Sequence, residues 1–317
     1  MTVSVITPIY NGEIYLEKFI KSIKKNTFKD TEYIFIDNNS TDNTVFFLKN
    51  LLESTNLSYK ILKENRQGAG FARNTGINYA KGDYLIFLDI DDSINPEKIA
   101  YDFKIMKENN VDFVFCRALR FYEDGREIKH PIDGIKSGIN NPPNLGIIWL
   151  KHFFYLQGPG SMFVKKQIVL ELGGFHTSRT GEDAFMFIKM GLLYKGYFYD
   201  KTFFNYFRHS KSTISSVNLI ENGTLLSYFN IRKDLFIDTV IQNNSLSKSI
   251  VSKQLQVDIL RLNKEGYKIQ GLLQDDKLEL LKLDFIIFNK LSLLINKMVS
   301  KIYYNPFYRL WLKRQMF

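Results

Sequence analysis

The stretch that decides the fold is Leu85-Ile86-Phe87-Leu88-Asp89-Ile90-Asp91-Asp92, in which an apolar run leads directly into three acids. A short apolar run of this kind predicts a buried strand. Three like charges this close repel one another unless a cation or strong hydrogen-bond donors neutralise them. Because carboxylate oxygens suit Mg²⁺ or Mn²⁺, the stretch predicts a cation site at the end of the strand. In the alternative interpretation the acids are solvated loop residues, and Asp92 caps the next helix.

Further apolar runs surround this strand along the first half of the chain. They cover Val3–Ile9, Glu32–Ile36, Ser58–Leu62, Tyr84–Leu88 and Val111–Cys116, and segments with helical spacing separate them. Strands that alternate with helices are typical of right-handed β-α-β units. The pattern therefore predicts an α/β fold with a Rossmann-like, mostly parallel sheet flanked by helices.

Polar motifs follow three of these strands. Pro8-Ile9-Tyr10-Asn11-Gly12 ends the first strand, Asp37-Asn38-Asn39-Ser40 the second, and Asp89 to Asp92 the fourth. Ligands of such sheets bind beyond the carboxyl ends of the strands, so we expect the three motifs to converge on one site. Taken alone, the second motif is equally typical of a turn in which Ser40 or Thr41 caps a helix.

A glycine-containing segment, Asn65 to Gly76, offers a different kind of ligand contact. Glycines allow the backbone to approach a ligand closely, and Arg73 can pair with a phosphate or a base carbonyl. Gly68 and Gly70 lack the third glycine of the dinucleotide fingerprint, so the segment disfavours a dehydrogenase.

Gly181-Glu182-Asp183 places an acidic pair at a predicted helix start. Acids are favoured there by the helix dipole, so a simple cap is one interpretation. The other is a general base that deprotonates an acceptor hydroxyl. The residues alone leave both open.

Composition limits the classes of protein that the chain can belong to. The net charge of +10 favours anionic partners, and Cys116, which is the single cysteine, cannot form a disulfide within the chain. The four histidines show no zinc spacing. No basic leader precedes the first strand and no apolar run reaches about 18 residues, so we expect a cytoplasmic protein or one peripheral at the inner face of the cell membrane.

Taken together, these motifs resemble the family 2 glycosyltransferases, which have the GT-A fold. The resemblance covers roughly residues 1–215, and the order of its six motifs is more specific than any one of them. The matching segments are Val3 to Asn11, Ile36 to Asp42, Ala72 to Gly76, Phe87 to Asp92, Glu171-Leu172-Gly173-Gly174-Phe175 and Gly181 to Asp183.

The resemblance assigns the donor site. It implies that Pro8, Tyr10 and Asp37 line a nucleotide-base pocket, with Asn11 beside them. The family usually has a second acid where this chain has Asn38, and an amide can both accept from and donate to uracil, so a UDP-sugar is the first expectation. Arg73 would border the base or the phosphates, Asp89 would contact ribose or sugar, and Ile90 is the last of the implied nucleotide-sugar-binding residues.

The resemblance also implies a metal and a base. Asp91 would hold Mn²⁺ or Mg²⁺, and His209 would lie where many relatives close a loop over the diphosphate and the metal. Asp183, with Glu182 beside it, would take the proton from a hydroxyl of a glycan, a polysaccharide or a lipid-linked saccharide. The transfer of a hexosyl or N-acetylhexosaminyl group would invert the anomeric carbon.

Two domains are expected. Residues 1–215 would form the catalytic domain, with nucleotide-sugar binding in 1–115 and the acceptor side in 116–215, and 216–317 would form a helical subdomain. Its last part, 285–317, has six basic residues, no acidic one and interleaved aromatics. This segment could be a packed helix with a solvated face, a helix on an anionic membrane surface, or a homodimer contact.

The sequence disfavours three other functions. A nucleotidyltransferase would need a basic loop after the first strand, where the chain has Tyr10-Asn11-Gly12-Glu13. A non-catalytic nucleotide-sugar binding module is disfavoured because Arg73, Asp91 and Asp183 are all present. Nucleic-acid binding is disfavoured because no recognition motif appears.

Overall fold

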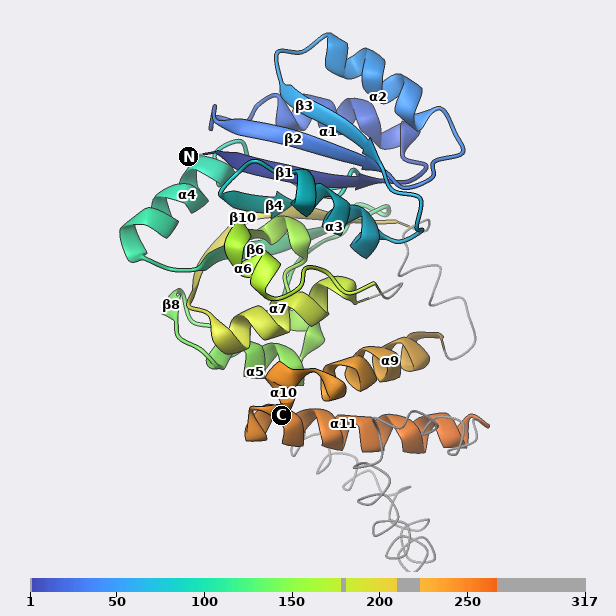
Figure 1. Ribbon diagram of the computed structural model, residues 1–317, viewed down its shortest axis with the longest axis vertical. Helices are drawn as coiled ribbons and strands as arrows, with labels where there is room; N and C mark the ends of the chain where they lie inside the picture. Colours follow the sequence, from blue (N-terminus) through green and yellow to red (C-terminus); the bar gives the residue numbers. More distant parts are fainter. Residues whose placement is uncertain (1, 178–180, 210–222, 267–317) are drawn as a thin grey trace, which may run out of the picture. The chain divides into compact units, whose positions relative to one another are not determined.

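The computed structural model describes residues 2–177, 181–209 and 223–266 (Figure 1). The chain divides into two compact units, 1–216 and 217–317, which are described separately. The first is built around a sheet of ten strands. The second is helical throughout its described residues.

The sheet of the first unit has the strand order β3-β2-β1-β4-β9-β6-β10-β5, with β7 added beside β6 and β8 beside β10. Its strands are β1 Val3–Ile9, β2 Thr31–Asp37, β3 Ser58–Lys63, β4 Tyr84–Phe87, β5 Ser93–Ile94, β6 Phe113–Tyr122, β7 Glu127–Lys129, β8 Gly138–Asn140, β9 Met162–Lys165 and β10 Gly196–Arg208.

Parallel pairing dominates the two long parts of the sheet. Strands β3, β2, β1 and β4 are mutually parallel, and β6 is parallel to β10. The short strand β9 lies antiparallel between β4 and β6 and joins the two parts. The predicted α/β fold, a mostly parallel sheet flanked by helices, is confirmed.

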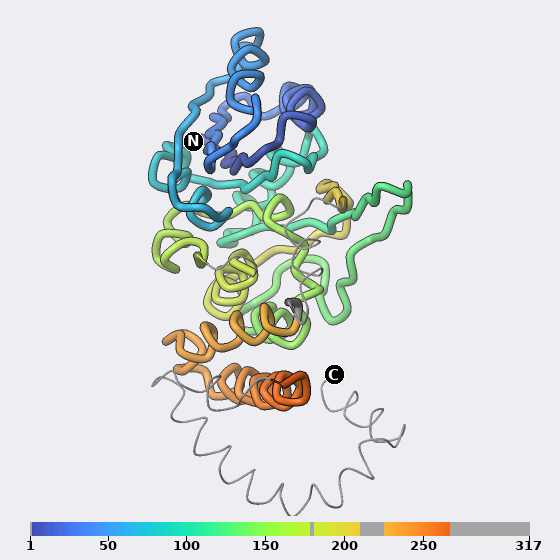
Figure 2. Tube along the Cα trace, turned by 90° about the vertical axis from the view of Figure 1, so that its right-hand side faces the viewer, coloured from blue at the N-terminus to red at the C-terminus, as the bar shows by residue number. Residues whose placement is uncertain are grey.

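Helices cover both faces of the sheet. Those of the first unit are α1 Leu16–Ile23, α2 Thr44–Glu53, α3 Ala69–Tyr79, α4 Lys98–Asn109, α5 Asn144–Lys151, α6 Lys166–Glu171 and α7 Glu182–Leu193. Apolar residues of α1, α2 and α4 share one core with Val5 and Phe35 on one face. On the other face α3 packs closely, because a Cβ at Gly76 would lie 2.5 Å from Ile6 Cγ2. Figure 2 shows the unit turned by 90°.

Some local expectations differ from the structure. β6 continues to Tyr122, well beyond the apolar run that predicted it, because Leu119 to Tyr122 pair with β10 although Arg117 and Arg120 interrupt the run. Asp92 does not cap a helix: α4 begins at Lys98 with Glu97 as its N-cap. Ser40 and Thr41 are not caps either, because α2 begins at Thr44 after Asn43.

The described part of the second unit contains α9 Gly223–Ile237, α10 Thr239–Gln242 and α11 Ser245–Lys264. Asp238 and Asn244 cap α10 and α11 by accepting hydrogen bonds from backbone N–H groups. Among the described helices, none combines the length and apolar character that a bilayer-spanning segment requires. The predicted membrane or dimer contacts of 285–317 lie outside the described residues.

Candidate functional site

The polar motifs that follow β1, β2 and β4 meet at one edge of the sheet, because these parallel strands all end there. At the end of β1, Pro8 pairs with Ile36 and Tyr10 is exposed. Asn11 holds the two loops together: its Oδ1 accepts from Thr41 N at 2.8 Å.

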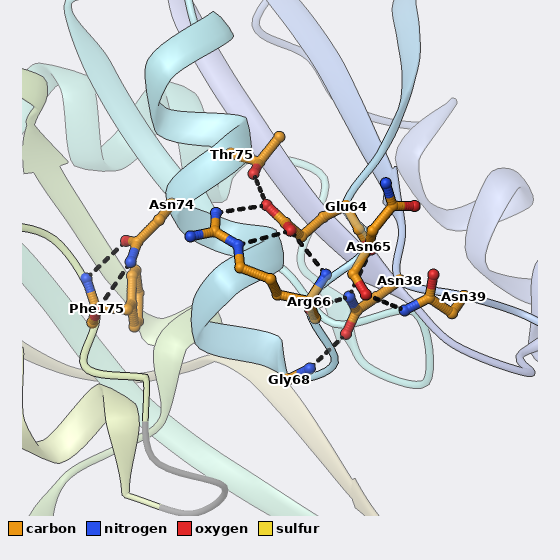
Figure 3. Close-up of polar contacts among 9 residues, drawn as sticks. All are labelled: Asn38, Asn39, Glu64, Asn65, Arg66, Gly68, Asn74, Thr75 and Phe175. Atoms are coloured by element: carbon orange, nitrogen blue, oxygen red, sulfur yellow. Dashed lines mark hydrogen bonds and ion pairs between the residues drawn. The ribbon is translucent and has the colours of Figure 1, made fainter.

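Asp37 and Asn38 differ in how they use their side chains. Asp37 Oδ1 accepts from Ser40 N at 3.0 Å, which shapes the loop after β2. Asn38 is buried, and its Nδ2 donates to the carbonyl oxygens of Glu64 at 2.9 Å and Arg66 at 2.7 Å. Its Oδ1 accepts from Gly68 N at 2.7 Å (Figure 3). Asn38 therefore fixes the loop that leads into α3.

The same loop is held from its other side by Glu64. This carboxylate accepts from Arg66 Nη2 at 2.9 Å and from Thr75 Oγ1 at 2.6 Å (Figure 3). The hydrogen bond from Arg66 lowers the pKa of Glu64 to about 2, so the carboxylate stays charged at neutral pH. The start of α3, which carries Arg73 toward the site, is thereby fixed to β2 and β3.

Arg73 is the centre of the site. Its guanidinium is buried and donates through Nη2 to Asp89 Oδ1 and through Nη1 to Glu182 Oε1, each at 2.7 Å. It also lies over the ring of Phe175, at 5.1 Å from the centroid. Burial opposes the charge, but the two carboxylates outweigh it and raise the pKa of Arg73. We call Arg73, Asp89, Asp91, Glu182 and Asp183 the acidic site.

Three carboxylates of the acidic site, those of Asp89, Glu182 and Asp183, bind protons more readily than free carboxylates do. Burial, followed by the charge of Asp183, raises the pKa of Glu182 to about 7, although Arg73 opposes the shift. Burial also raises the pKa of Asp183, whose Oδ1 accepts from Ala184 N at 2.8 Å. Burial raises the pKa of Asp89 as well. A carboxylate with a raised pKa is better matched to accepting a proton near neutral pH.

Asp91 and His209 lie side by side, although they are far apart in the sequence. His209 Nε2 is 2.8 Å from Asp91 Oδ2, and the Tyr15 hydroxyl is 3.2 Å from His209 Nδ1. The imidazole stacks on Phe207, with the centroids 5.3 Å apart. Tyr15 and Phe207 therefore set the orientation of the ring.

Asp92 has a role different from that of Asp91 and His209. Its Oδ1 accepts from Phe207 N at 2.9 Å, which ties the acidic loop to β10. Its Oδ2 is buried and has no hydrogen-bond partner among the described residues. Burial and the charge of Asp91 raise the pKa of Asp92 well above its ordinary value. The side chain of neighbouring Ile90 is buried against Gly12.

The side chains of Asp91 and His209 could hold a divalent cation together with other ligands. Within the described residues, no three His, Cys, Asp or Glu side chains converge to hold a metal ion by themselves. Asp91 and His209 offer one oxygen and one nitrogen 2.8 Å apart. Two protein ligands suit an ion that also binds substrate phosphates, and a nitrogen ligand favours Mn²⁺ over the harder Mg²⁺.

A further contact joins α3 to the loop before α7. Asn74 Nδ2 donates to Phe175 O, and Phe175 N donates to Asn74 Oδ1, both at 2.8 Å (Figure 3). A Cβ at Gly70 would lie 2.1 Å from His176 O, so a larger residue cannot occupy this position without moving the backbone. The residue motifs had pointed to this region without assigning a role to Asn74, Tyr15 or Glu64.

Comparison with known proteins identifies the family. Residues 4–167, half of the chain, match the family model described as glycosyl transferase family 2. The chain belongs to glycosyl transferase family 2.

Curated relatives of this family 2 glycosyltransferase match it to different extents. The Escherichia coli UDP-Glc:alpha-D-GlcNAc-diphosphoundecaprenol beta-1,3-glucosyltransferase WfgD is 37% identical over 114 residues, 36% of this chain and 44% of that protein. The Staphylococcus aureus poly(ribitol-phosphate) beta-N-acetylglucosaminyltransferase TarP is 28% identical over 311 residues, 95% of this chain and 92% of that protein. The chain spans less than half the length of three curated relatives that it matches, WfgD among them: the matches cover 37% to 48% of those proteins.

Solved structures confirm the GT-A fold. Residues 1–349 of S. aureus TarS in complex with UDP-GlcNAc superpose with a TM-score of 0.63 at 20% identity, over 88% of this chain and 77% of that one. The Pyrobaculum calidifontis mannosyltransferase PcManGT, in complex with GDP-Man and Mn²⁺, gives a TM-score of 0.56 at 16% identity, over 99% of this chain and 83% of that one.

Proposed function

We propose that the protein is an inverting glycosyltransferase that moves a sugar from a UDP-sugar to a hydroxyl of a glycan, a polysaccharide or a lipid-linked saccharide. The observation that carries the proposal is the double ion pair of Arg73. It links Asp89, where β4 ends, to Glu182, where α7 begins, each at 2.7 Å. One guanidinium thus brings the donor-side acid and the helix that carries Asp183 together.

The relatives support the donor class. A structural neighbour binds UDP-GlcNAc, and WfgD is a glucosyltransferase named for UDP-Glc. In this chain Tyr10 is exposed beside the loop after β2, which leaves a ring free to lie against a base. Three hydrogen bonds to the loop from Glu64 to Gly68 already occupy the side-chain amide of Asn38. We therefore propose that Asn38 supports the donor site by fixing this loop.

Asp183 is the proposed base. It would take the proton from the acceptor hydroxyl, and the oxygen would attack the anomeric carbon from the face opposite the leaving UDP. Glu182 holds Arg73 in place, because its Oε1 accepts a hydrogen bond from Arg73 Nη1. We therefore assign Glu182 a positioning role and reserve proton transfer for Asp183.

Asp91 and His209 would hold Mn²⁺ or Mg²⁺. Such an ion offsets negative charge on a nucleoside diphosphate as it leaves. The chain's own contribution is to hold the imidazole in place through Tyr15, Phe207 and the 2.8 Å contact with Asp91.

A panel of nucleotide sugars tests the proposal. The full chain is incubated with UDP-Glc, UDP-GlcNAc, UDP-GalNAc, GDP-Man and an acceptor extract, and released nucleoside diphosphate is measured with Mn²⁺, Mg²⁺ or chelator. We expect release from a UDP-sugar that requires metal. Activity with GDP-Man alone would contradict the assigned donor, and full activity in chelator would contradict the metal.

A further inference from the structure

Two arginines lie together on the acceptor side of the sheet. Arg120 is on β6 and Arg208 on β10, and the register pairs Arg120 with Tyr206 and Tyr122 with Arg208. Because side chains alternate between faces along a strand, Arg120, Tyr206 and Arg208 share one face. Phe207, between Tyr206 and Arg208, points to the opposite face, and His209 stacks on its ring. We call Arg120 and Arg208 the arginine pair.

Neither member of the arginine pair forms an ion pair with a carboxylate within residues 2–177, 181–209 and 223–266. Arg208 lies over the ring of Tyr206 at 4.9 Å from its centroid. Arg120 donates from Nη2 to His130 Nε2, and its buried Nε has no hydrogen-bond partner among the described residues. The same strands supply carboxylate partners elsewhere, since Arg117 pairs with Asp200 at 3.1 Å.

The side chain that contacts Arg120 does not balance its positive charge. Burial, followed by the charges of Arg120 and Arg208, lowers the pKa of His130 to about 3, so this histidine is neutral and accepts from Arg120. Burial and the charge of Arg208 also lower the pKa of Arg120. Two half-buried cations that repel one another are stabilised when an anion binds between them.

The arginine pair borders the proposed base. The charge of Arg208 acts on Asp183, where it contributes to lowering the pKa, and on Tyr206 beside it. The pair lies on the face of β6 and β10 opposite to Phe207, and His209, which contacts Asp91, stacks on Phe207. An anion held there would therefore lie near the acceptor hydroxyl and away from the metal ligands.

We propose that Arg120 and Arg208 form a subsite for a phosphate group carried by the acceptor. The planar guanidinium suits phosphate because it can donate two parallel hydrogen bonds to its oxygens. This inference rests on the proposed function, since it needs an acceptor. The other source of the same chemistry is the diphosphate of the donor, and the experiment separates the two.

Calorimetric titration of inorganic phosphate into the full chain tests the subsite at constant ionic strength. The titration is run with saturating UDP, so that the donor's phosphate contacts are occupied. We expect wild type to bind phosphate, and Arg208→Gln and Arg120→Gln to bind it at least about tenfold more weakly, since hydrogen bonds to charged groups are lost. Arg126→Gln is the matched control, because Arg126 is exposed and pairs with Asp124 at 2.7 Å.

Three outcomes would overturn the proposal. The first is no phosphate binding by wild type, and the second is equal binding by Arg208→Gln and Arg126→Gln. The third is a tenfold loss of UDP-GlcNAc affinity in Arg208→Gln, which would assign the pair to the donor. Arg208 is on the half-exposed end of β10, so its variants decide the question even where Arg120→Gln does not fold, with circular dichroism as the check.

The subsite and the proposed function fail separately. Phosphate binding is measured without turnover, so an inactive nucleotide-sugar panel leaves its result in place. Conversely, wild type that transfers sugar but binds no phosphate in the presence of UDP would overturn only the subsite. Arg208→Lys, which keeps the charge but loses the planar fork, should bind phosphate better than Arg208→Gln.

Discussion

Arg73 Nη1 lies 2.7 Å from Glu182 Oε1, and this contact crosses the acidic site from α3 to α7. The Arg73 side chain is only 3% exposed, and that of Glu182 13%. The pair is therefore a buried ion pair that holds the two halves of the site at a fixed separation. Its removal should affect stability and activity together.

Arg73→Met should lower the free energy of unfolding by about 3–5 kcal/mol, because it leaves Asp89 and Glu182 buried without their cation. Urea unfolding at pH 7 measures the change. Arg126→Met, which removes an exposed ion pair, should leave the unfolding midpoint close to that of wild type. Equal effects of the two substitutions would contradict the structural role of Arg73.

The stability of the first unit should depend on pH through Glu182. Burial and the charge of Asp183 raise its pKa from 4.5 to about 7 in the folded state. Between these values the folded protein holds a proton that the unfolded chain has lost, so the free energy of unfolding should fall as the pH rises from 4.5 to 7. Glu182→Gln should flatten this dependence, as followed by urea midpoints.

The control for this measurement is Glu97→Gln, because Glu97 is exposed and forms no side-chain cap bond. This variant should keep the pH dependence of wild type. A dependence that survives unchanged in Glu182→Gln would mean that another group is responsible for it.

Asp183→Asn should reduce transfer by about 10²- to 10⁴-fold, the usual contribution of a general base. Donor binding, measured by calorimetry with UDP, should stay intact, because Arg73 bonds to Asp89 and Glu182 and not to Asp183. In wild type, transfer should decline below the raised pKa of Asp183, since only the carboxylate accepts a proton. Asp30→Asn, at an exposed position, is the control, and turnover like wild type in Asp183→Asn would remove the base assignment.

Tyr15→Phe should raise the Mn²⁺ concentration needed for half-maximal activity by about tenfold, because partners that orient a ligating histidine contribute 10–100-fold to metal affinity. The Tyr15 hydroxyl is 3.2 Å from His209 Nδ1. His209→Ala should have a larger effect, and Tyr10→Phe, which alters an exposed hydroxyl, should have none. The metal titration would contradict the assignment if His209→Ala required no more Mn²⁺ than wild type.

The sequence predicted the parts of the fold that local pattern encodes. Mainly apolar runs predicted β1 and β4 close to their observed bounds, because a strand buried on both faces consists mostly of apolar residues. The second half of β6 escaped notice because Arg120 and Tyr122 interrupt its apolar pattern. The antiparallel insertion of β9 depends on pairing with two strands distant in the chain, which no local pattern records.

The sequence predicted which motifs form the site, but it predicted fewer of the contacts between their side chains. Motif order pointed to Asp91 and His209, which lie 118 positions apart in the sequence and 2.8 Å apart in the structure. The role given to Asp92 was wrong because its partner, Phe207 N, belongs to β10. Arg208 was not singled out from the sequence, because Arg120, with which it forms the arginine pair, lies on the neighbouring strand β6 and far away in the chain.

The pairing of β4 with β9 has a consequence for synthesis on the ribosome. Tyr84 pairs with Lys165 and Leu85 with Val164, so the edge of β4 is covered only after residue 165 has left the exit tunnel. Until then β4 exposes unpaired backbone groups, which are a template for pairing with another chain. A prematurely terminated product ending near residue 115 would carry most of the donor-side residues on a sheet with an open edge, and self-association would be its natural fate.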